Sequence, residues 1–193
     1  MINSQIQYLF FFICTFSIPN FLSAQTHFPR KEGRIVYEKV DSLKGFSKEQ
    51  LFGFSKKWFT DTFRNSKAVI QTEDFETGLL IGKGETSIVS PELLEKKFVW
   101  NDFVSGLYQF TIQIEVKNQK YRIRIYDISK HYLSNVYDGS KIFSPLEELD
   151  LIFNDDKKKA ERWKTFSPVI SDNFNSLMKS FSSKATEIKN DDF

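Results

Sequence analysis

The sequence predicts an α+β protein in which helices back an antiparallel sheet, because three patterns follow one another along the chain. A capped amphipathic helix comes first, two pairs of strand-like runs follow, and a long helical pattern ends the chain. The 27 basic and 25 acidic residues nearly balance, so net charge gives no reason to expect a nucleic acid partner. We expect a single domain over residues 25–189, with a C-terminal helical segment and a frayed tail over residues 190–193.

The N-terminal segment is typical of a signal peptide. Its first 25 residues carry no charged side chain, and the apolar run from Ile6 to Ile18 is shorter than the roughly 20 residues that cross a membrane. We expect cleavage after Ala24, which removes residues 1–24 and leaves a periplasmic or secreted protein with no stable membrane span. An uncleaved anchor is the alternative, since no basic residue precedes the run. The single cysteine, Cys14, lies within it, so residues 25–193 can form no disulfide.

A strand and a helix open the expected domain. The β-branched and aromatic run Arg34–Val40 predicts a strand that ends before Asp41 and Ser42. Ser47 and Gln50 then have the spacing of a capping box, which begins a helix. Its apolar stripe, which we expect in the core, consists of Leu51, Phe52, Phe54, Trp58, Phe59 and Phe63.

The next pattern predicts a hairpin from residues 68–72 and 79–88, joined through a turn from Asp74 to Gly78. Gly82 and Gly84 lie inside its second strand rather than between a strand and a helix, so they do not form a phosphate-binding loop. Such glycines mark a bulge or let another element approach the sheet closely. Residues 90–106 have no clear pattern and are expected to connect this hairpin to the next one.

The clearest pattern is a second hairpin, in which apolar residues alternate with polar ones on both sides of Asn118-Gln119. A two-residue turn there fixes the register, because a slip of one residue would turn every apolar side chain outward. The predicted cross-strand pairs are Glu115 with Arg122, Gln113 with Arg124, Ile114 with Ile123, and Val116 with Tyr121. One face of this hairpin should be buried and the other solvated.

The last third of the chain predicts helix. A turn-rich stretch over residues 127–139 leads to Leu146–Leu149 and then to a helical pattern from about Asp155 to Lys184. Pro168 should divide this pattern into two helices or bend it. The apolar stripe that could cover the sheet comprises Val169, Ile170, Phe174, Leu177, Met178 and Phe181.

Four sequence segments resemble an exported bacterial family of unknown function that has a TATA-binding-protein-like (TBP-like) fold. They are residues 33–37, residues 46–51 leading to Trp58, residues 77–84 and residues 121–128, and the resemblance covers about Arg30 to Ser129. It implies a curved antiparallel sheet, backed by an N-terminal and a C-terminal helix, in a Gram-negative envelope protein. No activity is attached to the family. Likeness to a DNA-binding fold does not transfer DNA binding, because function depends on the site.

The solvated face of the second hairpin is the best candidate for recognition. Its side chains could hold an anionic group, since arginine offers two parallel donors to a carboxylate or phosphate. The predicted binding residues are Gln113, Glu115, Lys120, Arg122 and Arg124. The alternative is an ordinary solvated face whose ion pairs contribute about 0–1 kcal/mol each.

Three functions remain open. The leading hypothesis is a non-enzymatic envelope module that binds a ligand or protein partner on the sheet face or in the groove beside the C-terminal helix. The second is a hydrolase or transferase that uses carboxylates such as Glu73, Asp74 and Glu76, and the third is a carrier of an apolar ligand, favoured by the 16 phenylalanines after residue 24. His27 and His131 are the only histidines, and no motif indicates a metal, a cofactor or a catalytic residue.

Overall fold

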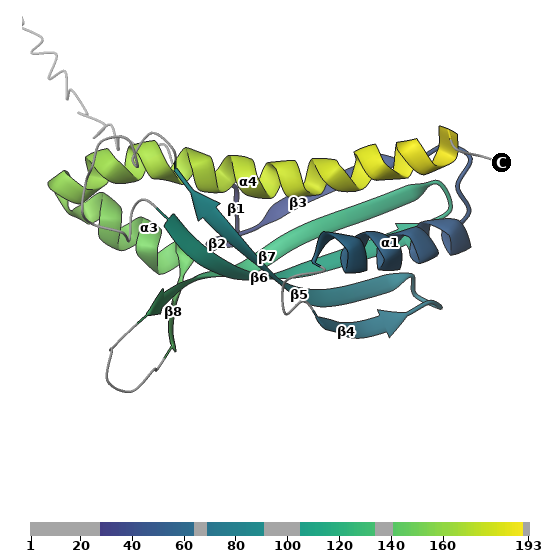
Figure 1. Ribbon diagram of the computed structural model, residues 1–193, viewed down its shortest axis with the longest axis horizontal. Helices are drawn as coiled ribbons and strands as arrows, with labels where there is room; N and C mark the ends of the chain where they lie inside the picture. The colour runs from purple at the N-terminus through teal and green to yellow at the C-terminus, as the bar shows by residue number, and fades with distance from the viewer. Residues whose placement is uncertain (1–27, 64–68, 91–104, 134–140, 191–193) are drawn as a thin grey trace, which may run out of the picture.

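The computed structural model describes residues 28–63, 69–90, 105–133 and 141–190, which form a sheet and a layer of helices (Figure 1). The larger sheet is antiparallel, in the order β3-β7-β6-β5-β4, and β8 also pairs with β7. The strands are β1 (Arg30–Lys31), β2 (Arg34–Ile35), β3 (Tyr37–Ser42), β4 (Val69–Asp74), β5 (Leu79–Val89), β6 (Ser105–Lys117), β7 (Lys120–Leu133) and β8 (Lys141–Pro145). The helices are α1 (Lys48–Thr62), α3 (Leu146–Asp155) and α4 (Lys157–Asn190). The predicted signal peptide, His27 and residues 191–193 lie outside the described residues.

The hairpin of β6 and β7 has the predicted register, including all four predicted cross-strand pairs. Its two-residue turn places Gln119 at a φ of 58°. The Gln119 carbonyl accepts from the Leu43 N–H at 2.9 Å, and the Asn118 side chain accepts from the Lys48 N–H at 3.0 Å. This turn therefore fixes the segment that leads into α1.

Strands β3 and β8 share one edge of β7. Residues 120–125 of β7 pair with β3, and residues 129–133 pair with β8. Between them lies Asp127, at a φ of 50°, where the β6–β7 ladder shifts by one residue. The predicted loop from residue 127 is wrong, because this bulge interrupts the ladder without ending the strand. β7 continues to Leu133, and residues 134–140 lie outside the described part of the chain.

The first predicted strand is divided in two. Val36 leaves the sheet and donates its N–H to the Pro29 carbonyl at 3.0 Å, so β2 pairs only with β1. β3 then continues through Asp41 and Ser42, which were expected to end it, because both pair with β7. A strand edge supplied from far along the chain overrides the local turn preference of these residues.

Buried polar contacts fix the N-terminal segment to α3 and α4. Arg30 donates to the buried carboxylate of Asp150 at 2.6 Å, and Trp163 donates its indole N–H to the same carboxylate at 2.7 Å. Glu147 accepts from the Ile35 N–H at 2.7 Å. Since a buried charge is stable only when it is paired and hydrogen-bonded, these contacts account for the burial of Asp150.

The two glycines of β5 allow α1 to lie close to the sheet. A Cβ atom at Gly82 would come within 2.2 Å of the Phe59 ring, and one at Gly84 would come within 3.0 Å of the Phe63 ring at the end of α1. The ladder between β4 and β5 also shifts between Ile70 and Thr72, opposite Gly82. The expectation of close approach at these glycines is confirmed.

Helix α1 begins as predicted, with Ser47 as N-cap and a capping box completed by Gln50. The six residues of its apolar stripe are all buried. At its C-terminal end, the Phe63 N–H donates to the Phe59 carbonyl at 3.2 Å. The helix therefore presents a continuous aromatic surface to the sheet and to α4.

Helix α4 passes through Pro168 without a break, so of the two predicted alternatives a division at that residue is wrong and a single helix is found. The division falls at Asp156, between α3 and α4, where its carboxylate accepts from the Lys158 and Lys159 N–H groups. Phe166 and Ile170, on either side of the proline, are fully buried. Their packing offsets the hydrogen bond that proline cannot make.

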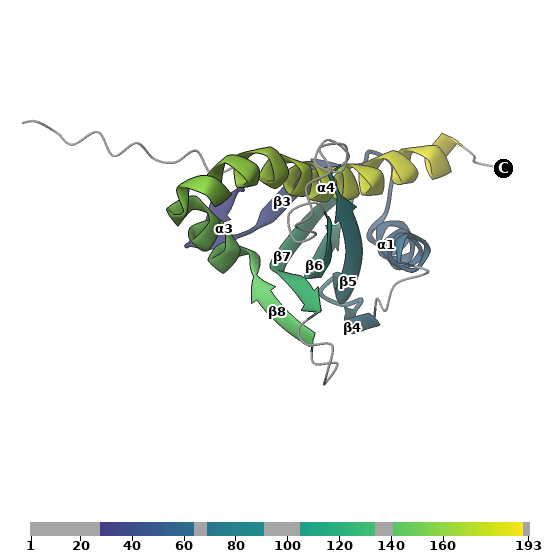
Figure 2. The same ribbon diagram turned by 60° about the vertical axis from the view of Figure 1, so that its left-hand side comes forward.

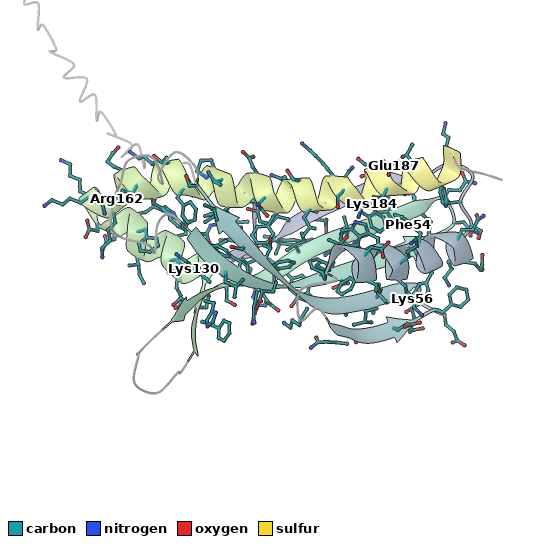
Figure 3. The ribbon with its side chains drawn as sticks, in the orientation of Figure 1. Phe54, Lys56, Lys130, Arg162, Lys184 and Glu187 are labelled. Atoms are coloured by element: carbon teal, nitrogen blue, oxygen red, sulfur yellow. The ribbon has the colours of Figure 1, made fainter. Side chains whose placement is uncertain are left out.

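Aromatic rings fill the interior between the sheet and α4. Phe181 lies 4.7 Å from Tyr121, 4.9 Å from Phe54 and 5.3 Å from Trp58 between ring centroids, and Phe54 extends from α1 into this layer (Figure 3). Phe110 and Phe174 lie 5.2 Å apart. This filled core does not support the apolar-carrier hypothesis. None of the described helices is long and apolar enough to cross a membrane.

Candidate functional site

All the described helices lie on one face of the sheet, so none of them covers the other, open face (Figure 2). The inner face presents Ile112, Ile114 and Ile123, which are completely buried beneath α1 and α4. The five predicted binding residues alternate with these side chains and lie together on the open face, which we call the outer face. Their juxtaposition follows directly from the predicted register.

A hydrogen-bonded network joins four of the five predicted residues. Arg122 pairs with Glu115, and Arg124 pairs with Glu38 of β3. Gln113 donates to Glu115 at 2.7 Å, and a second Arg124 nitrogen lies 3.8 Å from the Glu115 carboxylate. Both arginines are therefore already paired with carboxylates.

The network keeps its carboxylates ionised. Partial burial would raise the pKa of Glu115, but the hydrogen bond and charge of Arg122 outweigh it and lower that pKa below the ordinary value. The hydrogen bond from Arg124 lowers the pKa of Glu38 in the same way, and Glu115 raises the pKa of Arg122. At neutral pH the four charges of these two pairs cancel.

The cations that remain are lysines at the end of the hairpin. Lys117 and Lys120 are exposed, and neither has an ion pair among the described residues. They border a shallow hollow of about 200 Å³ together with Val40, Glu115, Tyr121 and Arg122. Val40 is 60% exposed, so an apolar side chain stands beside a basic rim.

Glu38, Val40 and Lys117 were missed by the sequence analysis as members of this surface. The alternation of the segment around Val40 indicates that it shares a face with Glu38, but nothing local indicates that β3 pairs with β7. Lys117 belongs to the same alternation as Glu115 and could have been included. The sequence predicted the register of the hairpin, but it did not show that β3 is the strand beside β7.

The carboxylates of the enzymatic hypothesis lie around the β4–β5 turn. Glu73 pairs with Lys56 at 2.6 Å, and Asp74 accepts from the hydroxyl and N–H of Thr77. The hydrogen bond from the Thr77 hydroxyl leads the causes that lower the pKa of Asp74, which is opposite to the shift that a general acid needs. Glu76 is exposed. This arrangement stabilises a turn and supports no acid–base pair.

His131, within the stretch expected to be turn-rich, is a half-buried residue of β7 whose ring stacks on Phe143 with centroids 5.0 Å apart. Within the described ranges, no three His, Cys, Asp or Glu residues come close enough to hold a metal ion.

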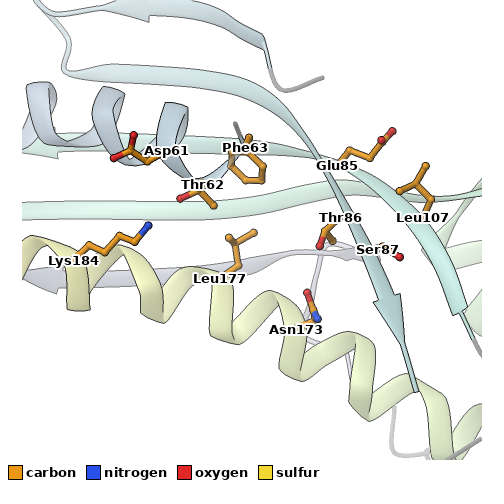
Figure 4. Close-up of a pocket in the computed structure, with 10 residues that line it drawn as sticks. All are labelled: Asp61, Thr62, Phe63, Glu85, Thr86, Ser87, Leu107, Asn173, Leu177 and Lys184. Carbon is orange, nitrogen blue, oxygen red and sulfur yellow. The ribbon is translucent and has the colours of Figure 1, made fainter. Parts of the chain in front are cut away.

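A larger hollow lies at the junction of α1, β5, β6 and α4 (Figure 4). This groove has a volume of about 730 Å³, within the range of small-molecule sites. The end of α1 contributes Asp61, Thr62 and Phe63. The strands contribute Glu85, Thr86, Ser87 and Leu107. Helix α4 contributes Asn173, Leu177 and Lys184.

An antiparallel sheet with the described helices on one face (Figure 2) is the arrangement that the resemblance to a TBP-like fold implied. Residues 37–131 match the model of a domain of unknown function (DUF4468) with TBP-like fold. The chain therefore carries a domain of this family, as its sequence resemblance predicted. The family has no named function, so membership assigns no activity.

Solved structures support the same fold. A DUF4468 family protein from Bacteroides ovatus is 18% identical, with a TM-score of 0.56 over 80% of this chain and 90% of that one. A TBP-like protein from Parabacteroides distasonis is 13% identical, with a TM-score of 0.56 over 81% of this chain and 97% of that one. No curated protein matches this sequence.

Proposed function

We propose that this protein is an exported, non-enzymatic binding module whose outer face binds an acidic segment of a partner protein. The observation that carries the proposal is the hollow beside Val40, where Lys117 and Lys120 have no carboxylate partner in the part of the chain that the structure describes. Exposed apolar area inside a polar rim is the usual anatomy of a protein interface. The two lysines make the rim complementary to negative charge.

The predicted arginines have a different role in this proposal from the one first expected. Arg122 and Arg124 hold the outer face in shape through Glu115 and Glu38, while the lysines meet the partner. Arg122 also borders the hollow, so an incoming carboxylate competes with Glu115 for it. Binding should therefore be weak unless the partner also covers Val40.

A poly-glutamate peptide is a direct probe, with binding measured by isothermal titration calorimetry at low and at physiological salt. Exchanging both lysines for glutamate (Lys117→Glu with Lys120→Glu) should weaken binding by tenfold or more. The matched control, Lys157→Glu with Lys158→Glu, makes the same change of charge on exposed residues of α4. It should bind as the native chain does, and native binding should weaken with salt.

Two results would contradict this assignment. Equal loss of binding in both double variants would mean that only net charge matters. Binding of a DNA duplex in preference to the peptide would replace the protein partner with a nucleic acid.

Export is part of the proposal and rests on the charge-free, apolar segment before Ala24. The chain produced with its own N-terminus in a bacterial host should be recovered outside the cytoplasm. N-terminal sequencing should show that it begins at Gln25. A chain that begins at Met1 and stays with the membrane fraction would instead support the uncleaved anchor.

A further inference from the structure

We infer that the groove between α1, β5 and α4 is a second binding site, separate from the hollow beside Val40, that takes a neutral, polyhydroxylated small molecule such as a saccharide. The side chains that line this groove have no part in the proposed function. Either site can therefore fail without the other.

The local charges of the groove balance, which favours a neutral ligand. Asp61 is paired with Lys57 at 3.1 Å, and Glu85 accepts a hydrogen bond from neutral Gln109 at 3.0 Å. The other two charged side chains of the lining, Glu85 and Lys184, carry one negative and one positive charge and lie at opposite ends of the groove (Figure 4). A charged ligand of either sign would therefore meet like charge as well as opposite charge in this lining.

The chemistry of the walls favours a ligand with many hydrogen-bonding groups. Carboxylates accept from hydroxyl groups, while amides and hydroxyls both donate and accept. Asn173 and Thr86 supply these groups beside the apolar side chain of Leu177 (Figure 4). An apolar ligand would bury these polar groups without partners, at a cost for each one.

Thr62 gives an independent indication that a polar partner is missing. Its hydroxyl oxygen is buried and has no hydrogen-bond partner among the described residues. Other hydroxyls in the helices donate to the carbonyl four residues earlier, as Thr60 does to Lys56 at 3.0 Å and Ser55 does to Leu51 at 2.7 Å. A buried polar group without a partner is destabilising, so a ligand hydroxyl or a water molecule at Thr62 would be favourable.

The edge of β5 adds backbone groups to the same place. In the described ranges, β4 pairs with β5 only as far as Lys83, so residues 84–89 have β6 on one side and no paired strand on the other. Alternate backbone groups of a strand point away from its neighbour. An added peptide strand is the competing occupant of this edge, but an extended peptide does not need the carboxylates and amide of the side walls.

The test uses maltose and cellobiose as probes of the ¹⁵N-labelled exported chain, with amide shifts followed by NMR. Both spectra and affinities are compared with those for a digalacturonate, spermidine and a neutral tetrapeptide. At least one disaccharide should shift the amides of Thr86, Ser87 and Asn173 with millimolar affinity.

Removing two groove hydrogen-bonding groups, Thr86→Ala with Asn173→Ala, should weaken that binding by about tenfold. The control Asn175→Ala with Ser176→Ala removes the same two groups from α4 outside the groove and should change nothing. The inference is overturned if neither disaccharide shifts the groove amides, if the groove variant binds as well as the control, or if a charged probe or the tetrapeptide binds there in their place.

Discussion

At the scale of single residues, the outer face shows how neighbouring charges decide which side chains remain available. Arg122 and Arg124 are the residues that a sequence inspection selects, yet each is held by a carboxylate. Lys117 and Lys120 are less conspicuous, but no carboxylate pairs with them in the described structure. A sequence shows which charges share a face, whereas pairing depends on a third strand.

Glu115→Gln tests the network through the pH dependence of stability. Because the pKa of Glu115 is lowered in the folded protein, its ionised form stabilises the fold above about pH 4.5, and this contribution is lost as the pH falls through the lowered value. The variant should lose at most about 1 kcal/mol at neutral pH. Urea unfolding should show that the unfolding free energy falls less in acid for this variant than for the native chain.

The matched control for that measurement is Glu148→Gln, which changes an exposed carboxylate on α3. If the unfolding free energy of Glu115→Gln falls in acid as steeply as that of Glu148→Gln, the ion pair between Arg122 and Glu115 contributes nothing to stability.

At the scale of elements, local patterns identified most helices and strands, and contacts between distant segments decided where they end. The β6–β7 hairpin was predicted in register because alternation and a two-residue turn act together. The extension of β3 through Ser42 and the whole of β8 depend on the edge of β7, which no local pattern reveals. Pro168 stays within α4 because buried side chains on both sides of it hold the helix on the sheet.

The contact between α1 and β5 can be tested with one substitution at two glycines. Gly82→Ala places a methyl group against the Phe59 ring and should cost about 1–3 kcal/mol of unfolding free energy. Gly53→Ala is the control, because Gly53 is exposed in α1 with nothing within 4 Å of a Cβ atom. It should stabilise the protein by roughly 0.5–1 kcal/mol. If both variants shift the urea unfolding midpoint in the same direction, α1 does not lie on Gly82 as described.

At the scale of the whole molecule, placing all the described helices on one side leaves two surfaces for function. The outer face could be predicted from the sequence, since its residues alternate with the core of the most regular hairpin. The groove could not, because its walls come from α1, β5, β6 and α4, which are distant in the chain. The alternating pattern of the sequence therefore predicts the outer face but not the groove. The function depends on which molecules bind to these two surfaces.

The most direct test of the central claim places a photo-crosslinking amino acid at Val40 in cells that export the protein. The proposed partner should give one discrete crosslinked product from position 40 and none from position 176, on an exposed part of α4. That product should disappear when Lys117→Glu and Lys120→Glu are added. A product that survives the charge reversal, or equal products from both positions, would contradict an acidic partner on the outer face.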